Sequence, residues 1–274
     1  ARRGIRMRRQ ANADLTYTYF NMEDPVVGGY TPEKVALRRA ISLAYDVRRE
    51  IHVARRGWAI PGQSPLVPHT TGYDSAYKSE MSDFDPARSR ALLDLHGYTD
   101  RDGDGWREAP DGSPLVLERS TQPDSSSRMQ DELFQKSMAL VGLKVRFKPA
   151  KWPDNLKAMQ AGKLQMWALG SLASQPDGIS ALQRLYTPAS GGANISFFSR
   201  PEFDALYEKL QALPDGPERL ALYHEAKRIV AAYVPYKYIS HRIYTDLAHP
   251  GVHGYRRPLF WLNFWEYLDI DETP

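Results

Sequence analysis

The feature that most constrains the fold is a unit of alternating strands and helices between Ser120 and Asp177. Apolar and basic residues alternate through 143–148, and residues 164–169 show the same period of two, which is typical of strands. Gly142 and Gly162 close the helix before each strand, where a left-handed residue commonly ends a helix. Strands separated by helices favour parallel pairing, so the sequence predicts an α/β fold organised around this unit.

This unit also predicts where a ligand would bind. Open α/β sheets bind ligands beyond the carboxyl ends of their strands. Loops 120–124 and 170–177 should therefore share one rim of the sheet. Aromatic and small polar residues gather near this rim, as in many ligand clefts. For each aromatic residue, packing in the core is an alternative, and Asp177 can instead cap the helix that follows it.

Charge and composition exclude several classes of protein. Five arginines within residues 2–9 exceed the net charge of +3, so the rest of the chain is not basic. These arginines are not interleaved with aromatic residues, so we interpret them as a solvated segment and expect no nucleic-acid partner. The absence of cysteine excludes disulfides, thiol catalysis and zinc–thiolate sites, and is compatible with cytoplasm or periplasm. No apolar run approaches the roughly 18 residues of a membrane span.

The two ends of the chain have no evident partner in the sequence between them. Residues 12–21 read as a strand, and an aromatic-rich tail covers 251–269, with Trp261 among its aromatic residues. Residues 1–14 lack the apolar region of a secretory signal, so either the protein is not exported or this chain begins downstream of its signal. A single helix is expected over 32–54, with Arg38 facing water.

An acidic loop offers one alternative function. Asp100, Asp102, Asp104 and Asp111 occupy positions 1, 3, 5 and 12 of a calcium loop, with Gly105 at position 6. A strand rather than a second helix follows, and Asp–Gly pairs also form tight turns because they tolerate positive φ. We therefore favour a hairpin, and keep a calcium-stabilised interaction module as the alternative.

Signals for catalysis are weak. A nucleophile elbow, a P-loop, a dinucleotide-binding turn and a zinc-protease helix are all absent. The histidines are dispersed, and the carboxylate pairs stand at helix starts, where the helix dipole already favours them. The sequence therefore predicts that the chain is not an enzyme and has no cofactor, with a hydrolase as the weaker alternative.

The order of short motifs resembles one known family. The resemblance covers residues 15–270 and lies in the order and spacing of the motifs rather than in any one of them. The matching segments include 19–21, 35–46, 62–72, 85–98, 102–105, 142–145, 161–162, 176–177, 203–206 and 234–236. The chain resembles the C-terminal half of the extracellular solute-binding proteins of family 5, which serve peptide- and nickel-type ABC importers.

This resemblance implies a type II periplasmic-binding-protein fold, in which two lobes close on a ligand. It implies a C-terminal ligand-binding lobe over 31–244, built on a mixed sheet flanked by helices. Residues 1–30 then form a remnant of the first lobe and the crossover strand, and 245–274 return to that lobe, which is missing from this chain. The implied partners are a small-molecule or peptide ligand, an ABC permease in the membrane and the missing lobe. The implied location is the periplasm of a Gram-negative cell, with lipid anchoring in a Gram-positive cell as the alternative.

One departure from the family bears on the ligand. Peptide binders of this family carry an aspartate shortly before the proline matching Pro176, where it pairs with the ligand's α-amine. Residues 170–175 contain no acid. We therefore expect a blocked or unusual peptide, an opine-like compound, a sugar derivative or a metal chelate, unless Asp177 substitutes. The candidate ligand-binding residues are Phe20, Asn21, Trp58, Ser120, Thr121, Trp152, Trp167, Gly170, Ser171, Gln175, Asp177, Asn194 and Phe197.

Overall fold

The structure is a computed structural model that describes residues 4–260 and 263–271. Arg2, Arg3 and Trp261, which entered the sequence interpretation, lie outside these residues. The α-helices are α1 Pro32–Ala44, α2 Val47–Val53, α3 Pro86–Leu95, α4 Ser125–Ala139, α5 Trp152–Gln160, α6 Ile179–Leu182, α7 Pro201–Ala212 and α8 Pro217–Tyr233. The 3₁₀ turns are η1 Glu80–Ser82, η2 Gln183–Leu185, η3 Thr187–Ala189 and η4 Trp265–Tyr267. Among the described residues, no helix is both long and apolar enough to cross a bilayer.

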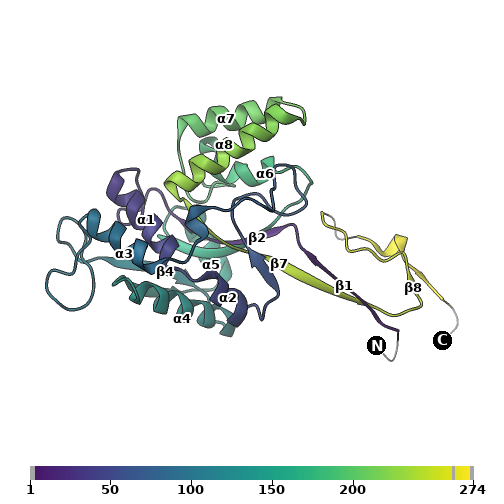
Figure 1. Ribbon diagram of the computed structural model, residues 1–274, viewed down its shortest axis with the longest axis horizontal. Coiled ribbons are helices and arrows are strands. Elements are labelled where there is room, and N and C mark those ends of the chain that lie inside the picture. Colours follow the sequence, from purple (N-terminus) through teal and green to yellow (C-terminus); the bar gives the residue numbers. More distant parts are fainter. Residues whose placement is uncertain (1–3, 261–262, 272–274) are drawn as a thin grey trace.

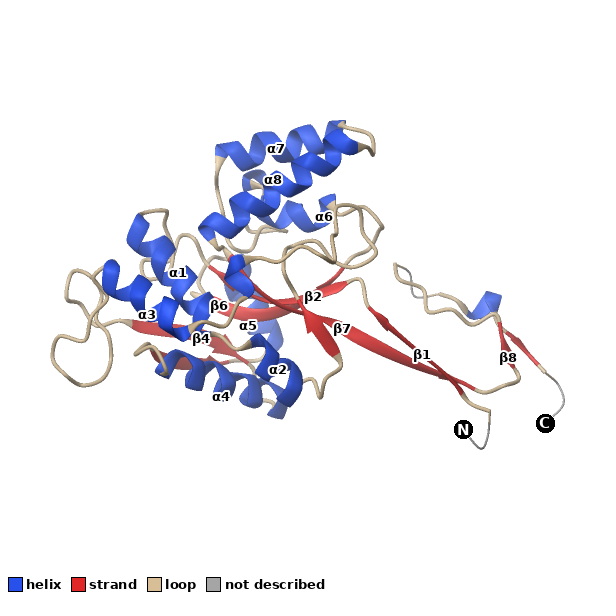
Figure 2. Ribbon diagram, in the orientation of Figure 1, coloured by secondary structure: helices blue, strands red, loops and turns tan. Residues whose placement is uncertain are grey.

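One mixed sheet organises the body of the molecule (Figures 1 and 2). Its strands are β1 Arg6–Ala11, β2 Asp14–Phe20, β3 Ala59–Pro61, β4 Val116–Thr121, β5 Lys144–Pro149, β6 Met166–Leu172 and β7 Tyr236–Ala248. Their order is β1-β7-β2-β6-β4-β5. In addition, the short strand β3 pairs antiparallel with residues 240–242 of β7. Strands β4, β5 and β6 are parallel, which confirms the pairing predicted for this unit, whereas β2 runs antiparallel to both β6 and β7.

Helices cover both faces of the sheet, and each face has its own core. Leu15, Tyr17 and Tyr19 of β2 point to a core that includes residues of α7 and α8. Phe20 joins the opposite core, with α1, α3 and α4. Strand β2 is therefore buried along its whole length, because its side chains alternate between two covered faces. The α/β fold with a mixed sheet flanked by helices is confirmed.

The first helical segment differs from the single helix expected over 32–54. It is divided into α1 and α2 at Tyr45, because Asp46 caps the second helix by accepting from the Arg49 amide at 2.9 Å. The prediction that Arg38 faces water is wrong. Its guanidinium is fully buried and donates to three backbone carbonyls, including that of Tyr233 at the last residue of α8. A buried arginine here supplies donors to a helix end whose carbonyls lack partners.

Strand β7 is long enough to serve two parts of the molecule. Its first half pairs with β2 in the body, whereas residues 243–248 pair with β1 over residues 6–11. This second part, which we name the β1–β7 ribbon, extends away from the body and leads to β8 Val252–His253 and β9 Asp269–Ile270 (Figures 1 and 2). By contrast, β2, for which the sequence shows no evident partner, lies inside the sheet and pairs with β6 and β7.

Candidate functional site

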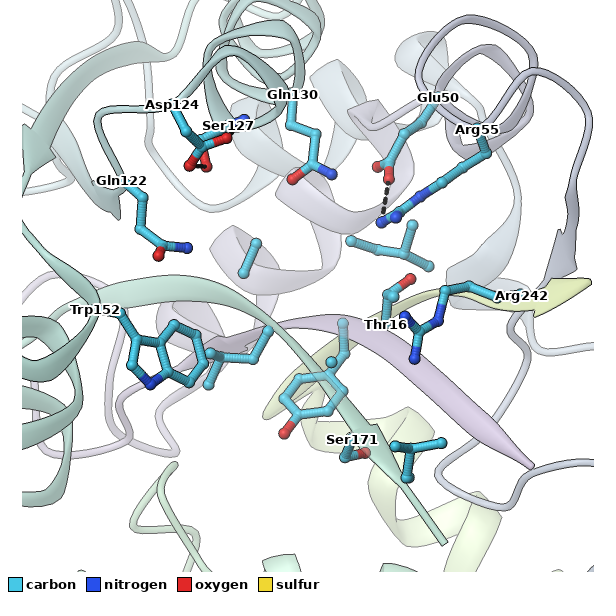
Figure 3. A pocket seen from close by; sticks show the side chains of 16 residues that line it. Thr16, Glu50, Arg55, Gln122, Asp124, Ser127, Gln130, Trp152, Ser171 and Arg242 are labelled. Carbon is cyan, nitrogen blue, oxygen red and sulfur yellow. Dashed lines mark hydrogen bonds and ion pairs between the residues drawn. The ribbon is translucent and has the colours of Figure 1, made fainter. Parts of the chain in front are cut away.

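A cavity of about 360 Å³ opens at the rim where β4 and β6 end. Because these strands are parallel, the loops after them meet at one edge, as the sequence predicted. The cavity is also bounded by β2, β7 and the end of α2. Figure 3 labels ten of its lining residues: Thr16, Glu50, Arg55, Gln122, Asp124, Ser127, Gln130, Trp152, Ser171 and Arg242. A larger hollow, about 620 Å³, lies between α8 and residues 77–81, away from these strand ends.

The floor of the cavity contains an unpaired strand edge. Strand β6 pairs with β2 over its whole length, but with β4 only at Met166 and Trp167. The amide of Ala173 donates to the carbonyl of Ala13, just before β2, so the backbone groups of alternate residues 168, 170 and 172 point to the opposite edge. Residues 168–172 all line the cavity. At Gly170 and Leu172, the amides and carbonyls on this edge have no backbone partner among the described residues and can pair with an extended ligand, as an added strand would.

Trp152 forms an aromatic wall of this cavity. It is the first residue of α5, its side chain is 46% exposed, and its ring lies 4.9 Å from that of Trp167. Trp167 is buried in β6 and does not line the cavity, so it supports Trp152 from the core side. An exposed indole held by a buried one offers a fixed apolar surface to a ligand.

Two acid–arginine pairs occupy the other end of the cavity. Glu50 is 2% exposed, accepts from the hydroxyl of Tyr45 and lies 3.4 Å from Nη2 of Arg55. Burial, together with the Glu50 charge, raises the pKa of Tyr45, so its hydroxyl remains a donor. Arg242 donates through Nε to the buried Asp14 at 2.5 Å. These polar residues were missed at the sequence level, because they come from α2 and β7, far in sequence from the rim loops.

The carboxylate of Asp177 binds other residues of the protein rather than facing the cavity. Its Oδ2 lies 2.7 Å from Arg219, and its Oδ1 accepts from the Tyr223 hydroxyl and the Ile179 amide. Partial burial opposes ionisation, but the hydrogen bonds from Arg219, the Ile179 amide and Tyr223 outweigh it and lower the pKa of Asp177. Asp177 does not line the cavity. The carboxylate therefore holds the loop before α6 against α8.

Of the predicted site residues, Trp152, Gly170 and Ser171 line the cavity. Three others are buried anchors. Asn194 donates to the carbonyls of Tyr186 and Phe198, and Asn21 donates to that of Gly162. Phe20 packs in the core beneath the sheet. These buried side chains shape the loops around them rather than presenting polar atoms to the cavity.

The remaining predicted residues lie outside the cavity lining. Ser120 and Thr121 are buried at the end of β4, and the hydroxyl of Thr121 donates to Asp131 of α4. Gln175 is exposed beyond the end of β6, and Trp58 is 40% exposed beneath the guanidinium of Arg9. Phe197 has a positive φ of 55°. Its ring would lie 3.3 Å from a Cβ atom at Gly162.

The acidic loop is closed as a hairpin, the arrangement that the sequence favours, but Glu108 rather than Asp111 lies with the other acids. Asp100, Asp102 and Asp104 lie together with Glu108, and their closest carboxylate oxygens are within 4.8 Å of one another. Asp111 instead accepts from the amide and hydroxyl of Ser113. The clustered aspartates accept from backbone amides of their own loop, and an antiparallel bridge from Glu108 to Pro114 closes the hairpin.

Comparison with known proteins places this geometry in context. The model of the family described as "Bacterial extracellular solute-binding proteins, family 5 Middle" matches residues 1–193. The chain is 28% identical to di/tripeptide-binding protein 2 of Pseudomonas aeruginosa over 224 residues, which are 80% of this chain and 40% of that protein. It is 25% identical to heme-binding protein A of Haemophilus influenzae over 271 residues, which are 97% of this chain and 46% of the relative.

Two solved structures show the same fold over half of their length. The oligopeptide-binding protein AppA of Bacillus subtilis, in complex with a nonapeptide, matches with a TM-score of 0.81 at 16% identity, covering 98% of this chain and 53% of that protein. HbpA2 of Haemophilus parasuis matches with a TM-score of 0.80 at 21% identity, covering 97% and 50%. The chain thus spans about half the length of the relatives it matches.

Proposed function

Since the chain belongs to the bacterial extracellular solute-binding proteins of family 5, we propose that it forms the C-terminal lobe of a receptor that captures a peptide-like solute for an ABC importer. The free edge of β6 in the rim cavity is the observation that carries this proposal. An extended backbone can add to this edge, and Trp152 can cover its side chains. The relatives named as di/tripeptide-binding proteins support a ligand of this class.

The proposed receptor has two lobes and works by binding and release, without chemical change of the solute. A first lobe would close over the rim cavity, and the β1–β7 ribbon would connect the two lobes. Hinged domains that close around a ligand produce a closed conformation, which a permease can distinguish from the open one. We place the receptor in the periplasm, consistent with the extracellular class of its family.

Thermal-shift measurements on the full-length protein test this function. Pools of randomised di- and tripeptides should raise the melting temperature, because a ligand that binds only the folded state stabilises it. Calorimetry would then compare the best-binding sequence with derivatives N-methylated at one amide at a time.

N-methylation removes an amide donor, so at least one position should lose about tenfold in affinity. A receptor that tolerates methylation at every amide would contradict pairing with β6. If no peptide pool shifts the melting temperature, the peptide class itself is wrong.

A further inference from the structure

Two arginines at one end of the cavity retain unused donors. Arg55 follows α2 and Arg242 lies in β7, and in Figure 3 they lie on the same side of the cavity as Glu50. Within the described residues, Arg55 donates only through Nη2, over a long 3.4 Å, and its Nε is buried with no acceptor. The guanidinium of Arg242 donates only through Nε, to Asp14. Each side chain therefore keeps several N–H groups for a ligand.

The acids that line the cavity are already engaged. Glu50 accepts from Tyr45 on one oxygen and faces Arg55 with the other. Asp124 accepts from the amide and from the hydroxyl of Ser127, because it caps α4. Each oxygen of Asp124 accepts one hydrogen bond and can accept another, but in Figure 3 this side chain lies across the cavity from Arg55 and Arg242. An anionic group would meet guanidinium donors that lack acceptors.

The loop of residues 170–177 also favours an anionic over a cationic ligand group. Residues 170–175 contain no acid, and Asp177 is bound to Arg219 and Tyr223. Ser171 lines the cavity, and its hydroxyl is buried without a hydrogen-bond partner among the described residues. At the end of the cavity where the arginines lie, this lobe therefore offers guanidinium donors, and Glu50 there is buried and already paired.

We infer that Arg55 and Arg242 bind a carboxylate of the solute, and that the solute carries no free α-amine within this lobe. The inference rests on the proposed function and names its substrate class, an N-blocked peptide or similar acyl compound with a free carboxylate. Guanidinium groups fit this role because their planar fork matches the two oxygens of a carboxylate.

The test uses the full-length protein and three pools of randomised tripeptides. The first pool is N-acetylated with a free carboxylate, the second is N-acetylated with a carboxamide, and the third has both termini free. The best-binding sequence is then measured by calorimetry in all three forms. The acetylated acid should bind about tenfold or more tightly than its amide, because the amide cannot form charged hydrogen bonds with the arginines.

Variants locate the effect. Arg55→Gln should lower affinity for the acid about tenfold and leave affinity for the amide unchanged. Arg242→Lys keeps a cation beside Asp14. It should lower the affinity for the acetylated acid in the same way, because lysine lacks the planar fork. Arg56→Gln is the matched control: Arg56 is exposed and does not line the cavity. Circular dichroism confirms that each variant is folded.

The outcomes separate this inference from the proposed function. Equal binding of acid and amide, or tightest binding of the free-amine form, would overturn the inference while leaving peptide capture intact. Equal losses in Arg55→Gln and Arg56→Gln would also overturn it. Failure of all three pools to bind would overturn the proposed function and this inference together.

Discussion

At the scale of single residues, Asp177 illustrates how a carboxylate on a ligand-binding rim can serve the fold alone. Arg219, its partner, has a side chain only 7% exposed, and Tyr223 is fully buried. Removing the carboxylate takes one acceptor from the Arg219 guanidinium and one from the Tyr223 hydroxyl, at a site that water reaches only in part. The loop before α6 therefore depends on Asp177 for its attachment to α8, and a ligand at the rim meets the loop that Asp177 holds.

The first prediction follows from this attachment. Asp177→Ala should lower the free energy of unfolding by about 2 kcal/mol, the scale of a charged hydrogen bond. Asp215→Ala is the control, because Asp215 also pairs with Arg219 but its side chain is 72% exposed, and it should cost about 0.5 kcal/mol. Urea denaturation measures both. Asp177→Asn should keep peptide affinity within a factor of two or so, and a larger loss would show that Asp177 contacts the ligand.

The second residue-scale prediction concerns Lys237, which lies fully buried in β7 and donates to the Met81 carbonyl. Burial lowers the pKa of its ammonium to about 7, against the opposing effect of the Asp83 charge. Between pH 7 and the usual lysine range, the unfolded chain therefore binds a proton that the folded chain does not. Stability should rise with pH across this window and fall as pH drops toward 7.

Comparison with Lys237→Met isolates this contribution. The difference in unfolding free energy between wild type and variant should change steadily from pH 7 to pH 10, and should level off below pH 7. Urea denaturation at each pH supplies the two curves. A difference that does not vary with pH would mean that Lys237 stays charged in the folded state.

At the scale of elements, strands β5 and β6 could be predicted because alternating side chains encode them directly. The division between α1 and α2 could not, since helical periodicity continues across Asp46 and only the cap geometry reveals the break. Arg38 shows a related limit. An arginine is usually exposed, and the carbonyls that this one binds come from the loop before α1 and from the end of α8, 195 residues away.

The third prediction contrasts Trp152, which lines the cavity, with Trp167, which supports it from the core. Trp152→Ala should reduce peptide affinity about tenfold but cost the fold only about 1 kcal/mol, because the ring is half exposed. Trp167→Ala should cost about 3–5 kcal/mol, since it empties a buried site in β6. Calorimetry and denaturation separate the two effects. Unchanged affinity in Trp152→Ala would remove it from the ligand site.

At the scale of the whole molecule, the sequence located the rim but not the full cavity. Loops 120–124 and 170–177 are joined to parallel strands, so their proximity follows from topology. The arginines and Glu50 reach the same place through β7 and the end of α2, and strand order beyond the central unit is not encoded in local periodicity. Candidates such as Asn194 and Asn21 instead turn their polar atoms inward to satisfy loop carbonyls, among them that of Gly162, which precedes the amino end of β6.

The last prediction concerns the β1–β7 ribbon, where Met7 and Leu247 face each other in register and are 63% and 68% exposed. Paired apolar side chains this exposed are typical of a surface that another unit covers. We propose that the first lobe covers them in the full-length protein. Met7 should then oxidise more slowly with hydrogen peroxide than Met129 of α4, although Met129 is only 43% exposed in this lobe. Peptide mass spectrometry measures both sites in one sample, so Met129 serves as an internal control. Faster oxidation at Met7 would show that the ribbon stays open to solvent, and the connection between the lobes would then have to run elsewhere.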